Sequence, residues 1–261
     1  MKLRTLLATL AILTLVSGVA YAASRFSVTA REFDPAHSFL VQAEWLDGIG
    51  CPTSQNIQAF LPPAFSTTGT VTYKDPGCPS GDSADSHNQG LLLAKTGPTN
   101  DNAAAVADIK GVKGPLTELG YDLRKSTSAV TPMGSHCGAG APRFDVDTTV
   151  ASYFIGCNSP AAVQVASTST GWIRLRWGAA GVVLGYNQKT GVLEAITGDV
   201  KAIQIVFDEG QDTAPDFFGL AVLDNIDVNG TLVGRGGNTT PKGGGDNGDN
   251  NNGDNNGHGD D

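Results

Sequence analysis

The sequence has few of the residues on which metal and nucleophilic chemistry most often depend. Its 261 residues include only four histidines and four cysteines, and no C-x-x-C spacing occurs. His136 directly precedes Cys137, so the two side chains cannot easily share one tetrahedral ion. No G-x-S-x-G motif occurs, and Ser135 and His136 are neighbours whose side chains point to opposite faces of an extended chain. The sequence therefore gives little support to a zinc site or to a serine nucleophile.

Positive charge is also scarce. Lysine and arginine number 17 against 26 aspartate and glutamate residues, which gives a formal charge of −9. Removal of residues 1–22 would take away Lys2 and Arg4 and no acidic residue, so the charge would become −11. Such a chain is repelled by nucleic acids and by anionic lipid surfaces. We therefore expect no nucleic-acid partner and no membrane partner.

Long apolar runs are missing after the first residues of the chain. Lys2 and Arg4 precede the run LLATLAILTLVSGV, and Ala20-Tyr21-Ala22 provides a small-x-small cleavage site. This pattern predicts a signal peptide over residues 1–22, with an uncleaved membrane anchor as the alternative. We expect a secreted or periplasmic protein without membrane insertion.

The four cysteines, at positions 51, 78, 137 and 157, all follow the predicted signal peptide. An even number of cysteines in an exported protein indicates disulfide bonds, and four cysteines allow three pairings. We favour Cys51–Cys78 and Cys137–Cys157, because each pair encloses one compact, loop-rich segment. A metal site is the alternative.

Residues 23–234 have the pattern of one large all-β domain. Short alternating or β-branched runs are separated by Gly, Pro, Asn, Asp and Ser, and no sustained 3.6-residue apolar period occurs. The pattern predicts a single disulfide-stapled β-sandwich of jelly-roll type with about a dozen strands. The clearest runs begin at Phe26, Phe39, Gly69, Leu91, Ala104, Leu119, Gly171, Val182, Val192, Lys201 and Phe217.

Residues 235–261 have a different composition from the domain. They are rich in Gly, Asn and Asp and contain almost no apolar residue, so they cannot bury surface to offset chain entropy. A disordered tail is the expected state. Weak divalent-ion binding is the alternative, although Asp249, Asn251 and Gly253 lack the further ligands of a loop of EF-hand type.

Several blocks of the chain occur together in a known group of proteins. LTELGYDLRK, GSHCGAGAPRF, GCNSP, GWIRLRW and LDNIDVNG resemble blocks found in the same order in exported, uncharacterised bacterial β-sandwich proteins. The resemblance spans about residues 116–233 and implies no defined activity. The block LDNIDVNG also resembles the closing strand of jelly-roll carbohydrate-binding modules, which implies a sandwich that binds glycans.

The segment GWIRLRWG offers the best candidate for a ligand-binding surface. Strict alternation places Trp172, Arg174 and Arg176 on one face of a strand. An aromatic ring beside two guanidinium groups suits a stacked sugar ring with hydroxyl or carboxylate partners. The alternative is a packed tryptophan flanked by arginines that pair with acidic residues of neighbouring strands.

Acidic residues gather in FDEGQDTAPD and in the following LDNI. The oxygen atoms of Asp208, Asp212 and Asp224 form a candidate set of ligands for a structural Ca²⁺ ion. A solvated acidic loop is the alternative.

Specific expectations follow for the acidic pair Asp145 and Asp147 and for Arg143. Asp145 and Asp147 share a strand face, but the E-x-D-x-E spacing of jelly-roll glycoside hydrolases is missing, so no catalytic residue is assigned. Arg143 is expected to pair with a buried carboxylate such as that of Asp122.

Three functional classes are compatible with these patterns. The first is a non-catalytic exported module that binds an extracellular polysaccharide or surface polymer. The second is a polysaccharide-cleaving enzyme, a glycoside hydrolase or lyase, on the same scaffold. The third is a structural protein of an envelope or matrix.

Overall fold

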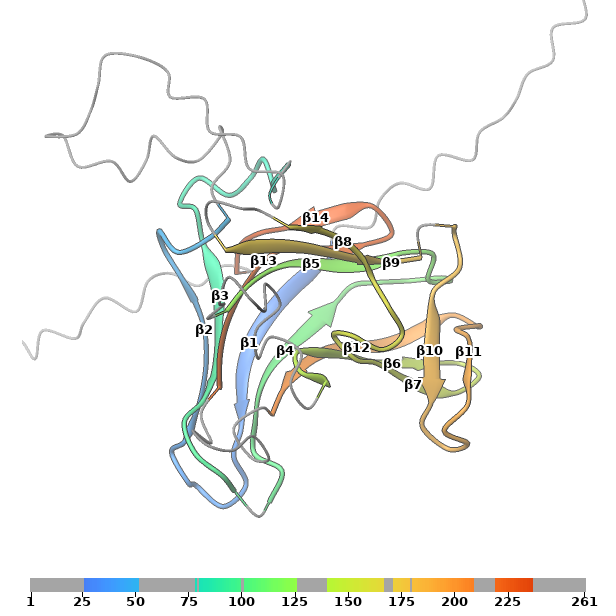
Figure 1. Cartoon of the computed structure of the whole chain (residues 1–261), viewed down its shortest axis with the longest axis horizontal. Coiled ribbons are helices and arrows are strands. Elements are labelled where there is room, and N and C mark those ends of the chain that lie inside the picture. Colours follow the sequence, from blue (N-terminus) through green and yellow to red (C-terminus); the bar gives the residue numbers. More distant parts are fainter. Residues whose placement is uncertain are drawn as a thin grey trace, which may run out of the picture.

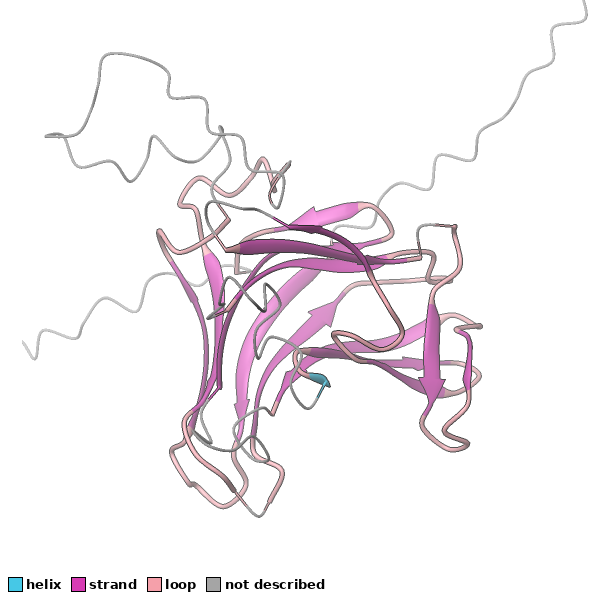
Figure 2. Ribbon diagram, viewed as in Figure 1, coloured by secondary structure: helices cyan, strands magenta, loops and turns pink. Residues whose placement is uncertain are grey.

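The computed structural model describes residues 26–51, 78, 80–99, 101–125, 140–166, 171–178, 180–208 and 219–236. Within these ranges the regular structure consists of β-strands apart from a 3₁₀ turn at Gly140, cyan in Figure 2, and no α-helix is present. The strands form two seven-stranded sheets in which every paired strand is antiparallel to its neighbour. The predicted β-sandwich is therefore confirmed, whereas the jelly-roll type stays a prediction.

Each sheet combines strands from distant parts of the chain (Figure 1). Sheet A has the order β1 (Ser27–Phe33), β4 (Ala104–Lys110), β12 (Val200–Phe207), β6 (Arg143–Thr148), β7 (Ser152–Ile155), β10 (Leu184–Asn187) and β11 (Leu193–Ala195). Sheet B has the order β2 (Val41–Leu46), β3 (Gly90–Lys95), β13 (Gly219–Val228), β5 (Leu119–Arg124), β9 (Trp172–Trp177) and β8 (Val163–Ala166), and β14 (Thr231–Val233) pairs with β13.

The alternation of the sequence decides which side chains enter the space between the sheets. On β9, Ile173, Leu175 and Trp177 belong to the shared core, on the face opposite Trp172, Arg174 and Arg176. The Trp177 ring lies 5.5 Å from that of Tyr121 on β5 and 5.8 Å from that of Phe144 on β6, measured between centroids. Because Phe144 belongs to sheet A and the other two rings to sheet B, this aromatic cluster joins the two layers.

The strand predictions hold for most of the described chain, and the predicted run that begins at Gly69 lies outside the described residues. They differ from the structure at two places. Strand β8 was not predicted from the sequence. The run predicted to begin at Phe39 forms a strand only from Val41, so Phe39 and Leu40 lie outside the strand. The reason is a turn described below.

Strands β1 and β2 are consecutive in the chain but lie in different sheets, each at an edge. The indole Nε1 of Trp45 donates a hydrogen bond of 3.2 Å to the carbonyl oxygen of Val28, which ties the two edge strands together. Residues 34–40 connect the strands at one corner of the sandwich. We call this connection the corner loop.

The disulfide Cys51–Cys78 is present, as predicted. Cys157 is also buried and disulfide-bonded, and Cys137, its predicted partner, lies outside the described residues. None of the described cysteines has a free thiol. Disulfide bonding is compatible with an oxidising compartment. Within the described residues, no helix is long and apolar enough to cross a membrane.

Candidate functional site

The outer face of sheet B carries a group of largely buried charged and polar side chains, which we call the polar centre. Its members are Asp122, Arg174, Arg176, Asp224, Asn225 and Asp227. They come from the three neighbouring strands β5, β9 and β13. Cross-strand register brings them together, because Asp122 lies directly opposite both Arg174 and Asp224.

Hydrogen bonds and ion pairs connect these side chains. The guanidinium of Arg174 donates from Nε to Asp122 Oδ1 at 2.7 Å and from Nη2 to Oδ2 at 2.9 Å. Asn225 donates from Nδ2 to the same carboxylate at 2.8 Å. Arg176 is 2.9 Å from Asp227 and 3.5 Å from Asp122. Arg174 therefore pairs with Asp122 on the neighbouring strand β5, whereas Arg176 reaches past β5 to Asp227 on β13.

The backbone is irregular where β13 passes the polar centre. The pairing with β5 shifts between Asp224 and Asp227, and Asn225 has a φ of 46°. A β-bulge of this kind redirects side chains locally. It turns Asn225 so that its Nδ2 reaches Asp122 while its Oδ1 accepts a hydrogen bond of 3.0 Å from the amide of Asp82.

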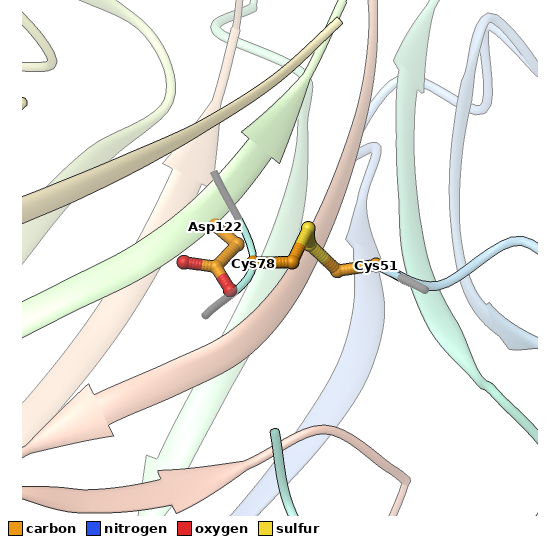
Figure 3. A group of neighbouring side chains, drawn as sticks. All are labelled: Cys51, Cys78 and Asp122. Carbon is orange, nitrogen blue, oxygen red and sulfur yellow. A yellow bond between two sulfur atoms is a disulfide. The ribbon is translucent and has the colours of Figure 1, made fainter. Parts of the chain in front are cut away.

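The Cys51–Cys78 disulfide covers the polar centre. The two sulfur atoms and a carboxylate oxygen of Asp122 lie within 4.8 Å of one another (Figure 3). The amide of Cys51 donates a hydrogen bond of 2.6 Å to Asp224 Oδ2. Arg174 also donates to the carbonyl oxygen of Ser80 at 2.9 Å. The chain on either side of the disulfide is therefore fastened to sheet B.

Trp172, Arg174 and Arg176 share the outward face of β9, as the alternation predicted. Trp172 packs against the Cys51–Cys78 disulfide and is only 1% exposed. Both arginine side chains are 12% exposed and ion-paired. The structure therefore has the alternative arrangement, a packed tryptophan flanked by paired arginines. In this arrangement Trp172 has no free ring face for a sugar.

Burial leaves the carboxylates of the polar centre in an unfavourable environment for negative charge. It raises the pKa of Asp224 well above its usual value, and the neighbouring Asp122 carboxylate raises it further. Burial also raises the pKa of Asp227 to about 6, against the opposite influence of Arg176. The pKa of Asp122 is raised by burial as well, with Arg174 and Arg176 acting in the opposite direction.

The predicted calcium ligands Asp208, Asp212 and Asp224 are not brought together by the described chain. Asp224 lies on the outer face of sheet B, whereas Asp208 directly follows β12 in sheet A, and Asp212 lies outside the described residues. The one described group of three metal-ligating side chains within reach of one another is Cys51, Cys78 and Asp122. Its two sulfur atoms are bonded to each other and so offer no thiolate.

Arg143 has a different partner from the one predicted. It donates to Asp208 at 2.7 Å and to Asp145 at 3.2 Å on the outer face of sheet A. The expected pair with Asp122 is wrong, because Asp122 belongs to the other sheet and is bound by Arg174. Asp145 does share a strand face with Asp147, and burial raises the pKa of Asp145.

Among the described residues, the most exposed aromatic side chain lies in the corner loop. Phe39 is 86% exposed and has a φ of 59°, in the left-handed region that residues other than glycine rarely adopt. An exposed apolar ring on a strained backbone is unfavourable unless the surrounding chain holds it there. Strain of this kind concentrates at functional sites.

Asp34 holds the corner loop in this conformation. Its Oδ1 accepts hydrogen bonds from the amide and the hydroxyl of Ser38, at 2.9 and 2.8 Å. Its Oδ2 accepts one from the amide of Phe39, at 2.8 Å. These bonds lower the pKa of the Asp34 carboxyl, the amide of Ser38 having the largest effect. The loop is thus organised around one ionised side chain.

A surface pocket of about 350 Å³ lies beside this loop, and we call it the corner pocket. It contains an aromatic ring, small apolar side chains and polar groups that can bond to hydroxyls. The lining residues are Glu32, Asp34, Phe39, Leu40, Val41, Gln42, Ala94 and Thr96. They come from β1, the corner loop, β2 and the end of β3.

A second aromatic feature lies at the other end of sheet A. Phe154 on β7 and Tyr186 on β10 are cross-strand partners with ring centroids 5.2 Å apart and planes inclined by 20°. The Tyr186 hydroxyl is 2.8 Å from the hydroxyl of Ser159. Because these two rings cover each other's faces, less ring face is free here than at Phe39.

Comparisons with protein-family models, with curated proteins and with solved structures give no match for this chain.

Sequence reasoning missed Phe39, although a signal for it was present. The segment DPAHS before it contains an aspartate four residues ahead of a serine, with a proline next to the aspartate. Aspartate in such a position often accepts hydrogen bonds from the backbone of a following turn. From that signal, the loop can be predicted to end, and the strand to begin, after Phe39.

Proposed function

We propose that this protein is an exported, non-catalytic β-sandwich module of jelly-roll type that binds a polysaccharide in the corner pocket. Secreted or periplasmic location follows from the predicted signal peptide and is compatible with the disulfide. The observation that carries the proposal is Phe39, whose ring is exposed in the pocket lining and whose backbone amide is bound by Asp34.

The chemistry of the pocket suits a sugar. A pyranose ring presents an apolar C–H face, which stacks on an aromatic side chain, and hydroxyls at its edge. Glu32, Gln42 and Thr96 provide a carboxylate, an amide and a hydroxyl around Phe39. Because the Asp34 carboxylate fixes the backbone of Phe39, little chain entropy is lost when a ligand binds.

A retention experiment tests the proposal. The purified protein is passed through gels that contain individual polysaccharides, and Phe39→Ala is compared with Phe33→Ala. Phe33 is a matched control, because it is 44% exposed, lies six residues away and does not line the pocket. We expect Phe39→Ala to weaken binding at least about tenfold, which corresponds to about 1.4 kcal/mol. Phe33→Ala should bind like the wild type.

Two results would contradict this function. Equal losses in both variants would show that Phe39 is not the anchor, and lack of retention on every polysaccharide would remove the proposed ligand class. Release of reducing or unsaturated ends during incubation would favour the polysaccharide-cleaving alternative.

A further inference from the structure

The charged side chains that line the corner pocket are all acidic. Its lining includes the two carboxylates of Glu32 and Asp34 and no lysine, arginine or histidine. Asp34 remains an anion because three hydrogen bonds from Ser38 and Phe39 converge on its oxygens. A ligand in this pocket therefore meets negative charge that no lining cation offsets.

Neighbouring cations do not neutralise Glu32. Arg31 precedes it on β1, but adjacent residues of a strand point to opposite faces. Arg31 instead forms an ion pair of 3.0 Å with Asp108 on the outer face of sheet A. Within the described part of the chain, the Glu32 side chain takes part in no ion pair or hydrogen bond, whereas its backbone belongs to the β1–β4 ladder. Its carboxylate is thus available to a ligand.

The exposed face of Phe39 adds a second attraction for positive charge. The face of an aromatic ring carries negative potential and attracts an ammonium group. A protonated amine between the ring and the Glu32 carboxylate would satisfy both groups, whereas a uronate or sulfate group would be repelled by both. The formal charge of −9 for the whole chain acts in the same direction.

We infer that the corner pocket selects a glycan that carries protonated primary amines, such as a glucosamine polymer without acetyl groups, over neutral and uronate-containing glycans. This inference rests on the proposed function of the same pocket. The amine would lie between Phe39 and Glu32, and Gln42 and Thr96 would bond to hydroxyls of the sugar.

The test compares glucosamine oligomers with N-acetylglucosamine oligomers of the same length, by calorimetry at about pH 6, where amines are protonated. The wild type should bind the amine form at least tenfold more tightly. Glu32→Gln should remove most of this preference. Glu44→Gln is the matched control, because Glu44 is an exposed carboxylate on β2 that does not line the pocket. It makes the same change in net charge and should keep the preference.

The outcomes separate this inference from the function on which it rests. Equal binding of both oligomers, or tighter binding of polygalacturonate, with loss on Phe39→Ala would overturn the inference and leave glycan binding in place. Equal effects of Glu32→Gln and Glu44→Gln would also overturn it, because they would reveal attraction by net charge alone. Absence of binding to all oligomers would overturn both.

Discussion

Trp172 and Phe39 are aromatic residues in similar sequence contexts and in opposite structural situations. Each belongs to an alternating run, WIRLRW or FLVQAEW. Trp172 is 1% exposed beneath a disulfide, whereas Phe39 is 86% exposed beside a pocket. The difference shows that alternation alone does not decide exposure: a distant disulfide covers Trp172 on its strand, whereas a local turn around Asp34 keeps Phe39 outside the strand.

Replacement of the two aromatic residues by alanine should give the largest difference in the free energy of unfolding. Trp172→Ala removes a buried indole and leaves a cavity beside Cys51, Cys78 and Val222, so it should lower the free energy of unfolding by about 3–5 kcal/mol. Phe39→Ala removes a ring that is exposed in both states and should change it by less than about 0.5 kcal/mol. Urea denaturation of both variants measures the difference. Similar losses in the two variants would mean that Phe39 packs in solution.

Removal of the Cys51–Cys78 disulfide is a second way to test how much the region around Trp172 contributes to stability. The disulfide closes a loop with a sequence separation of 27, and replacement of Cys51 and Cys78 by alanine should destabilise the protein by about 3–4 kcal/mol. The same change should leave glycan binding at the corner pocket unaffected under conditions in which the variant is folded. Loss of binding by a folded variant would show that the two regions are coupled.

The pH dependence of stability should report on the polar centre. The pKa values of Asp224 and Asp227 are raised in the folded protein, so the folded state keeps protons that the unfolded state releases. The resulting stabilisation is present below about pH 4, the ordinary aspartate value, and is lost as the pH rises through about 6, the pKa of folded Asp227.

Thermal unfolding between about pH 5 and pH 7.5 measures this effect. The melting temperature should fall as the pH rises across that range. Asp224→Asn removes one titrating carboxyl, so the melting temperature of this variant should depend less on pH, whatever the effect of the substitution on absolute stability. A melting temperature that climbs steadily toward neutral pH would contradict the assignment.

Much of the fold could be predicted from the sequence, because strand patterns are local. The alternation of residues 171–178 correctly placed Trp172, Arg174 and Arg176 on one face of β9, opposite the face that enters the core. The order of strands in the sheets is not a local property. For that reason the partner predicted for Arg143 was wrong: Asp122 lies close to it in sequence but in the other sheet.

The candidate site was harder to predict for the same physical reason. The cover over Trp172 comes from Cys51 and Cys78, more than 90 residues earlier in the chain. The exposure of Phe39 depends on how the Asp34 side chain binds backbone amides, which apolar periodicity does not record. The prediction of a Cys51–Cys78 disulfide was correct. It rested on loop composition and on the even number of cysteines, and neither requires knowledge of the order of strands in a sheet.

The isolated β-bridge between Val28 and Gly236 determines which way the corner pocket would face if the protein were attached through its C-terminal residues. It brings the chain that follows β14 to the start of β1, whereas Glu32 and the corner pocket lie near the end of the same strand. Four residues of strand separate Val28 from Glu32 by about 13 Å. A tether through the residues after Gly236 would therefore hold the molecule by one end of β1 and direct the pocket away from the point of attachment.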